Sequence, residues 1–196
     1  MNKIGVLVSG GGSNLEAIIE ACKNGVLKDI AQVCVVISNR PDAYALQRAK
    51  NNNITDIFID RKKFSTSFEF SNAILQELIK YKIDLVCLAG FMQKIETNLI
   101  NAFKGRILNI HPALLPKFGG KGMYGHFVHE AVIAAKENKS GATVHLVDDQ
   151  YDHGKLVAQI EVPVLANDTA QTLAQRVLEV EHDLYPKAIK VILEDK

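Results

Sequence analysis

The chain has 196 residues, of which 47% are hydrophobic and 23% charged, values that are ordinary for a globular domain with a buried core. Its formal net charge is +1, and its longest basic run is the three residues 61–63. Proteins that bind nucleic acid or an anionic membrane through charge present a basic face or stripe. We therefore expect neither a nucleic acid nor a membrane among the partners.

The cysteines and the first residues both bear on the cellular compartment. Cys22, Cys34 and Cys87 are odd in number and lie in apolar patterns, so we interpret them as buried thiols in a reducing compartment. The first apolar strand begins at Lys3, without a signal sequence or an apolar run of membrane-spanning length. The sequence predicts a cytoplasmic protein.

Short apolar strands alternate with amphipathic helices through the first two-thirds of the chain. We expect strands at residues 4–8, 33–37, 57–59, 85–88 and 107–110. We expect helices at residues 15–22, 43–51, 70–81 and 96–103. Continuously apolar strands separated by helices indicate a parallel sheet with both faces covered. The sequence therefore predicts an α/β fold with a doubly wound, Rossmann-like, mostly parallel sheet.

The last third departs from this alternation. It predicts a glycine-rich loop, a helix and an antiparallel strand pair, at residues 119–125, 127–137, 142–147 and 157–162. Apolar residues from Leu173 to Leu184 predict a long terminal helix that Pro186 would kink. Because no repeat or linker divides the chain, we expect a single domain, residues 1–196, with halves at 1–110 and 111–196.

The turn after the first strand, residues 9–14, has the sequence Ser-Gly-Gly-Gly-Ser-Asn. Such a strand-to-helix turn presents backbone N–H groups and a helix N-terminus to an anion, and Ser13 and Asn14 add side-chain donors. A P-loop would end in Gly-Lys-Ser/Thr, and a dinucleotide fingerprint would have glycine in place of Leu15 and an acid after the second strand. A single phosphate ester fits this turn, and the alternative is a tight turn without a ligand.

Two polar side chains interrupt the apolar strand at 107–110. Asn109 and His111 lie at i and i+2 and leave the same face, and Pro112 ends the ladder. An amide donor beside a titratable imidazole suits a reaction in which an oxyanion forms and a proton moves. Capping of backbone groups is the alternative. In an open α/β sheet this strand end shares the carboxyl edge, where ligands bind, with the glycine-rich turn.

A carboxylate beside His111 would favour the imidazolium and could take a proton through a water. Acids after the strand at 142–147 could supply it, and their spacing does not choose among Asp148, Asp149 and Asp152. Turns rich in Asp are common structural features, and taken alone these acids favour that interpretation. A zinc site needs three or four converging ligands, and we expect none from the scattered cysteines and from His126, His129, His145 and His153. His145 could be a core residue or line a pocket.

Five motifs follow one another along the chain. They are residues 9–14 (SGGGSN), 88–92 (LAGFM), 108–116 (LNIHPALLP), 141–154 (GATVH running on to DHG) and 181–186 (EHDLYP). Together they resemble the glycinamide ribonucleotide formyltransferase family of purine biosynthesis. The resemblance implies the formyltransferase fold and transfer of a formyl group from the co-substrate 10-formyltetrahydrofolate to the amino group of glycinamide ribonucleotide. It implies no metal and allows a monomer or a homodimer.

The resemblance also assigns roles to residues. It makes Asn109 a donor to the carbonyl oxygen that becomes the oxyanion, and His111 the imidazolium that stabilises this charge and supplies a proton. It makes Asp152 the group that holds His111 charged and helps to move the proton of the attacking amine. The residues that match contacts to the substrate phosphate are Gly12, Ser13 and Asn14. Glu181 matches a contact to the substrate ribose. The folate pocket is matched by Leu88, Met92, Gln93, Lys94, Ile95, Ile107, Asn109 and Val147.

Three segments depart from the family's commonest pattern. Gln93 and Lys94 stand where an Arg and an apolar residue are frequent. The loop at 122–126 differs from that of many relatives, so no contact is transferred to it. Ser67 stands where a folate-contacting Arg can occur and is likewise left out of the expected site.

Two related families share the Asn, His and Asp set. Formyltetrahydrofolate hydrolases use water as the acceptor and usually carry an extra N-terminal domain, and methionyl-tRNA formyltransferases add a C-terminal nucleic-acid-binding domain. The expected elements leave room for neither addition, and the phosphate turn favours a small phosphorylated acceptor. A binding module without catalysis would not need Asn109, His111 and Asp152 together.

Overall fold

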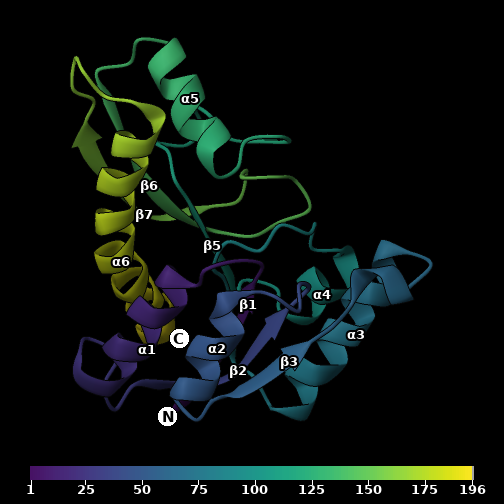
Figure 1. The fold of residues 1–196 in the computed structure, drawn as a ribbon. Helices are drawn as coiled ribbons and strands as arrows, with labels where there is room; N and C mark the ends of the chain where they lie inside the picture. The colour runs from purple at the N-terminus through teal and green to yellow at the C-terminus, as the bar shows by residue number, and fades with distance from the viewer. Residues whose placement is uncertain (196) are drawn as a thin grey trace.

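The computed structural model describes residues 1–195, which form a seven-stranded sheet in the order β3-β2-β1-β4-β5-β6-β7 (Figure 1). The strands are β1 (Asn2–Val8), β2 (Ala31–Ser38), β3 (Thr55–Phe58), β4 (Leu85–Leu88), β5 (Ile107–His111), β6 (Lys139–Leu146) and β7 (Leu156–Pro163). The first five strands pair in parallel, and β6 and β7 extend the sheet in antiparallel pairing. This arrangement confirms the predicted fold class.

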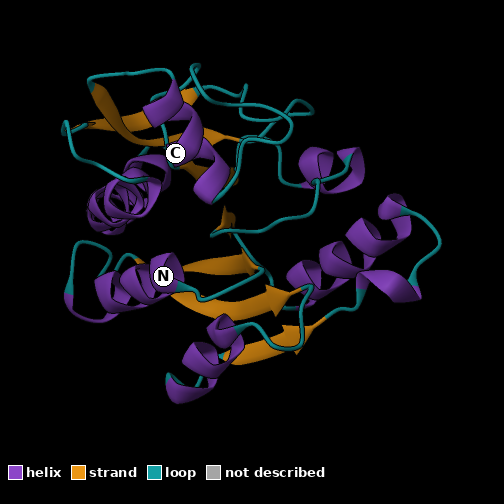
Figure 2. Cartoon of the chain, turned by 45° about the horizontal axis from the view of Figure 1, so that its top comes forward, coloured by secondary structure: helices purple, strands orange, loops and turns teal. Residues whose placement is uncertain are grey.

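Helices cover both faces of the sheet (Figure 2). They are α1 (Ser13–Asn24), α2 (Tyr44–Asn51), α3 (Ser67–Lys80), α4 (Thr97–Ala102), α5 (His126–Ala134) and α6 (Ala170–Glu194), with a short 3-10 helix, η1 (Arg61–Lys63). One apolar cluster joins one sheet face to α1, α2 and α6, and a second joins the other face to α3 and α4. Within residues 1–195, no helix has the length and apolar character needed to cross a membrane.

The predicted element boundaries differ most around β6. The prediction of a helix to residue 137 was wrong by three residues, because α5 ends at Ala134 and Lys136 adopts a left-handed backbone with φ 52°. The predicted strand began at 142, whereas β6 begins at Lys139. Its first residues are held by backbone pairing with β7, Lys139 opposite Pro163 and Gly141 opposite Glu161, and apolar patterning does not report such pairing.

Tyr185, a fully buried residue of α6, ties this helix to the sheet. Its hydroxyl lies 3.0 Å from the carbonyl oxygen of Leu88 in β4 and 3.0 Å from that of Leu108 in β5. Burial raises the pKa of the phenol well above its ordinary value, so the hydroxyl remains a donor. The helix continues through Pro186 to Glu194. The Tyr185 hydroxyl fixes α6 to β4 and β5, the two strands that carry the site described below.

Replacing Tyr185 by Phe would remove this donor and leave the two buried carbonyl oxygens with one partner fewer. We expect the free energy of unfolding, measured by urea denaturation, to fall by about 1–2 kcal/mol. Tyr44→Phe is the matched control, because the Tyr44 ring is 56% exposed and its loss of a hydroxyl should change stability little. Equal stability of the Tyr185→Phe variant and the wild type would show that the hydroxyl does not hold α6 to the sheet.

Candidate active site

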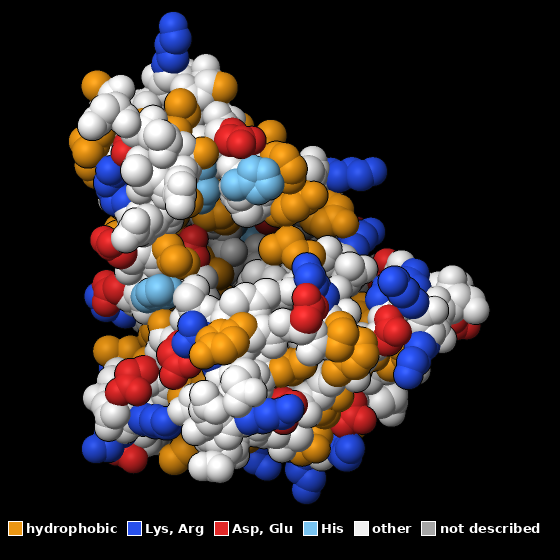
Figure 3. Space-filling view, in the orientation of Figure 1, with side chains coloured by type: hydrophobic (Ala, Val, Ile, Leu, Met, Phe, Trp, Pro, Cys, Tyr) orange, Lys and Arg blue, Asp and Glu red, His pale blue; other side chains and the backbone are white. Residues whose placement is uncertain are grey.

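A cavity of about 620 Å³ opens beside the ends of β4 and β5. Its wall includes the loops at residues 90–95 and 148–152, and part of the glycine-rich loop after β5, together with side chains of α5 and α6. Figure 3 shows a hollow in the middle of the molecule, with hydrophobic and histidine side chains at its edge. The parallel pairing of β1, β4 and β5 sets Leu7 beside Leu88 and Leu88 beside Asn109, so the strand ends that carry the predicted residues lie level.

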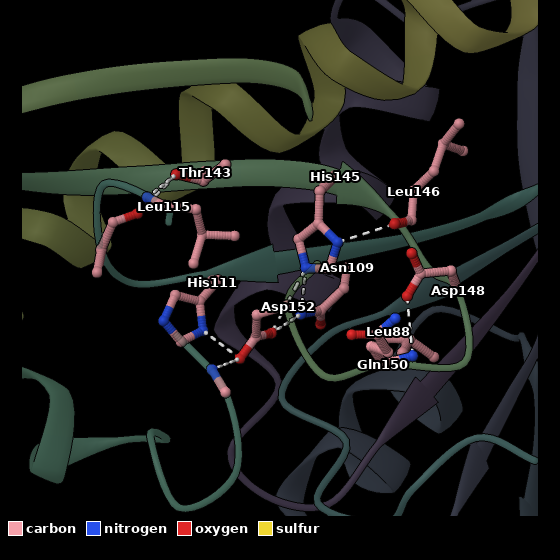
Figure 4. A network of polar contacts seen from close by, with 12 residues as sticks. Leu88, Asn109, His111, Leu115, Thr143, His145, Leu146, Asp148, Gln150 and Asp152 are labelled. Atoms are coloured by element: carbon pink, nitrogen blue, oxygen red, sulfur yellow. Dashed lines mark hydrogen bonds and ion pairs between the residues drawn. The ribbon is translucent and has the colours of Figure 1, made fainter. Parts of the chain in front are cut away.

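Four polar side chains meet in this cavity. Antiparallel pairing sets Asn109 in β5 opposite His145 in β6, and the Asn109 Nδ2 atom lies 3.1 Å from His145 Nε2. Asp152 contacts both polar residues of β5. Its Oδ1 atom lies 3.5 Å from Asn109 Nδ2, and its Oδ2 atom lies 3.6 Å from His111 Nδ1. Figure 4 shows these side chains pointing toward one another.

Asp152 is held in place by its backbone as well as by its side chain. Its φ of 54° places it in the left-handed region, which Asp tolerates better than most residues. The backbone N–H of Gly120 donates to Asp152 Oδ2 at 2.9 Å. Of the three acids that the spacing left open, Asp148 instead pairs with His153 at 2.9 Å and accepts the N–H of Gln150, so it closes a turn.

Burial and charge act in opposite directions on His111. Burial lowers the pKa of the imidazole below its ordinary value, and this effect exceeds the increase caused by the Asp152 carboxylate and by the Phe118 carbonyl, 2.7 Å from Nε2. That Asp152 keeps His111 charged stays a prediction, because burial, the larger effect on the pKa of His111, favours the neutral ring. Burial raises the pKa of Asp152, but the neighbouring His145 and His111 rings and the Gly120 N–H lower it by more.

The glycine-rich turn leads from β1 into α1. Gly12 has a φ of 73°, and a Cβ atom there would lie 2.6 Å from the Cβ of Ala45, so only glycine fits without displacement. Gly12 and Ser13 lie next to the cavity but outside its lining, whereas Asn14 and Glu181 line it. Asn14 Nδ2 donates to Glu181 Oε2 at 2.6 Å, and burial raises the pKa of Glu181 from 4.5 to about 7.

The residues matched to a folate pocket divide between the cavity and the core. The cavity is lined by Leu88, Met92, Gln93, Lys94, Ile95, Asn109 and Val147. Ile107 is 1% exposed and lies in the apolar cluster that packs α3 and α4 on the sheet. Its side chain is packed in this cluster and is not part of the cavity wall.

Two residues that shape this site had no role assigned from the sequence, Ser9 and His145, and His145 had been left open between the core and a pocket. The Ser9 hydroxyl donates to Asn39 Oδ1 at 2.6 Å and accepts the Met92 N–H at 2.8 Å, which fastens the cavity wall to the end of β1. His145 is both buried and in the cavity, and only the strand register reveals that it faces Asn109. In the described part of the chain, no three His, Cys, Asp or Glu side chains are grouped so that they could hold a metal ion.

Known proteins of one family match this chain along nearly its whole length. A sequence profile of the family described as formyl transferase matches residues 2–189. Phosphoribosylglycinamide formyltransferase of Haemophilus influenzae is 40% identical over 196 residues, which cover 100% of this chain and 89% of that protein. The chloroplastic phosphoribosylglycinamide formyltransferase of Vigna unguiculata is 45% identical over 194 residues, which cover 99% of this chain. The chain spans 62% of the length of the Vigna protein.

A solved structure agrees with these sequence relatives. The crystal structure of glycinamide ribonucleotide transformylase 1 from Symbiobacterium toebii superimposes with a TM-score of 0.93 at 40% identity, covering 100% of this chain and 89% of that one. The family profile and the full-length structural match extend over both halves of the sheet and the cavity between them. The chain therefore belongs to the formyl transferase family.

Proposed function

We propose that this protein transfers the formyl group of 10-formyltetrahydrofolate to the amino group of glycinamide ribonucleotide, a step of de novo purine biosynthesis. The observation that carries the proposal is the meeting of Asn109, His111 and Asp152 in one cavity. The Haemophilus and Vigna relatives, both named as phosphoribosylglycinamide formyltransferases, support the same activity.

The geometry suits addition of an amine to a formyl carbonyl. The amine nitrogen attacks the carbonyl carbon, a C–N bond forms, and an electron pair moves to the oxygen. An amide nitrogen carries two protons: the first points from Asn109 Nδ2 to His145 Nε2 at 3.1 Å, and the second points to Asp152 Oδ1 at 3.5 Å, a long contact that an oxyanion could replace. The Leu146 carbonyl, 2.9 Å from His145 Nδ1, fixes a proton on that nitrogen, so Nε2 accepts from Asn109 when the ring is neutral and can donate to Asp152 when the ring is charged.

Proton movement falls to His111 and Asp152. The Phe118 carbonyl fixes a proton on His111 Nε2, so a second proton on Nδ1 would lie between the ring and the Asp152 carboxylate. An anionic intermediate close by would favour that second proton. Asp152 accepts the proton that the attacking amine loses, by way of a water, and this proton is passed on to the folate N10. The bond between the formyl carbon and N10 then breaks with its electron pair going to N10, and the electron pair on the oxyanion re-forms the carbonyl.

The other end of the cavity suits a ribosyl phosphate. No side chain caps the N-terminus of α1 at Gly12, so its first backbone N–H groups are available to a phosphate. Asn14, the last residue of this turn, bonds Glu181, and both line the cavity that holds the catalytic side chains, so ribose hydroxyls could bind the carboxylate there. A phosphorylated amine would thus span the distance from the turn to Asn109.

The function can be tested with an acceptor panel. The purified protein is incubated with 10-formyltetrahydrofolate and with glycinamide ribonucleotide, water alone or initiator tRNA, and the formylated products are measured by mass spectrometry. We expect turnover with glycinamide ribonucleotide only. Release of formate at the same rate without an acceptor would instead indicate a hydrolase, and formylated tRNA a tRNA formyltransferase.

The roles of two catalytic candidates can be tested by substitution. We expect His111→Ala and Asp152→Asn each to lower kcat by about 10²–10⁴-fold, the usual contribution of a positioned acid or base. Calorimetric titration with glycinamide ribonucleotide is the control, because both variants should still bind it. Full turnover by either variant would contradict the role assigned to that residue.

Glu181→Gln should trade substrate affinity for stability. An acid whose pKa is raised in the folded state stabilises folding below its unfolded pKa and loses that contribution as the pH rises through the folded pKa. The difference between 4.5 and about 7 corresponds to about 3 kcal/mol at pH 8. We therefore expect Glu181→Gln to unfold at higher urea concentration than the wild type at pH 8 and at an equal concentration at pH 4.

The same variant should raise the KM for glycinamide ribonucleotide, because an amide accepts fewer hydrogen bonds from ribose hydroxyls than a carboxylate does. Equal stability of the variant and the wild type at pH 8 would show that the carboxylate is not penalised by burial. An unchanged KM would remove Glu181 from the substrate site.

A further inference from the structure

We propose that His129, in α5, is an uncharged hydrogen-bonding contact for the amine-bearing, phosphorylated substrate. This inference rests on the proposed function and adds a contact from α5 to those expected of Asn14 and Glu181. His129 was considered from the sequence only as a candidate metal ligand in the His126–His129 spacing. Its position in the cavity gives it a different use.

His129 lines the cavity and is 4% exposed. Its Nδ1 is buried and has no hydrogen-bond partner, and its Nε2, which is not fully buried, forms no hydrogen bond within residues 1–195. The two other buried histidines of the cavity are engaged, His111 with the Phe118 carbonyl and His145 with the Leu146 carbonyl. An unpaired buried ring is destabilising unless another group satisfies it.

The charge state of His129 restricts what it can bind. Burial, together with the smaller effect of the nearby His111, lowers the pKa of the imidazole to about 4. The ring is therefore neutral near pH 7 and offers one donor and one acceptor without a charge. It suits an amide or hydroxyl group of a ligand and gives no charge attraction to a phosphate.

The location of α5 indicates which substrate it serves. Three residues of α6 at i, i+4 and i+7 line the cavity as a stripe: Ala174, Leu178 and Glu181. The apolar side chain of Val132, one turn after His129, joins the core cluster of α6. His129 thus lies on a helix that packs against α6, the helix that carries Glu181, whereas the segment from Met92 to Ile95 follows the end of β4. The substrate that reaches Glu181 is the one that His129 would contact.

The test compares two substitutions of His129. His129→Leu removes both ring nitrogens, and His129→Gln keeps a polar group near the position of Nε2. We expect His129→Leu to raise the KM for glycinamide ribonucleotide by about tenfold, the loss of one neutral hydrogen bond. The KM for 10-formyltetrahydrofolate should stay unchanged, kcat should change less than the KM, and His129→Gln should recover most of the affinity.

His182→Leu is the matched control. His182 also has a buried ring nitrogen without a partner, Nε2, but it does not line the cavity, so both KM values should remain those of the wild type. Thermal unfolding without substrate separates a structural role from a binding role. A binding role predicts little change in Tm for His129→Gln and a smaller rise in Tm on adding glycinamide ribonucleotide.

An unchanged KM for glycinamide ribonucleotide in His129→Leu, or a rise confined to the KM for the folate, would overturn the proposal. Failure of His129→Gln to bind better than His129→Leu would also overturn it. If His129→Leu does not fold, calorimetric titration of His129→Gln and His129→Asn with the substrate decides, with tighter binding by the Gln variant expected and equal binding contradicting the contact. Absence of turnover by the wild type would refute the proposed function itself, an outcome distinct from these.

Discussion

Antiparallel pairing between β5 and β6 sets the positions of the polar groups in the cavity. The register places Asn109 opposite His145 and His111 opposite Thr143, so side chains from two strands share one face. Thr143 in turn donates to the Ala113 carbonyl at 2.6 Å and accepts the Leu115 N–H at 3.1 Å. These bonds fix the segment that follows His111. The connection from β6 to β7 then brings Asp152 over the same face, and a one-residue slip would turn all of these side chains away.

Burial and neighbouring groups together set the charge states of the ionisable side chains in the cavity. Asp152 stays ionised because His145, His111 and the Gly120 N–H together outweigh its burial, whereas burial prevails at His111 and at Glu181. Burial thus favours the uncharged forms of both His111 and Glu181 before a ligand arrives. A substrate that carries negative charge and hydrogen-bond donors would supply what each lacks. This arrangement is typical of a site that is built for binding at some cost to stability.

Much of the fold could be predicted from the sequence because its central strands are continuously apolar. Residues 35–37 and 85–88 are buried on both faces, and such runs identify strands without any knowledge of their partners. The site was harder to predict, because it depends on register and on loop conformation. Spacing alone left Asp148, Asp149 and Asp152 equivalent, and the turn closed by Asp148 and His153 separates them only in three dimensions. Ile107 was matched to the pocket from the sequence, yet its side chain is buried in the apolar cluster under α3 and α4.

Tyr185 connects the substrate end of the cavity to the catalytic end. Glu181 lies one turn before Tyr185 in α6, about 6 Å along the helix axis. The Tyr185 hydroxyl bonds the carbonyls of Leu88 and Leu108, and Leu108 directly precedes Asn109. One rigid helix therefore sets the distance between the proposed ribose contact and the amide that would face the oxyanion. Because a misplacement of about 1 Å can cost a hundredfold in rate, this buried hydroxyl links the stability of α6 to the alignment of the reacting groups.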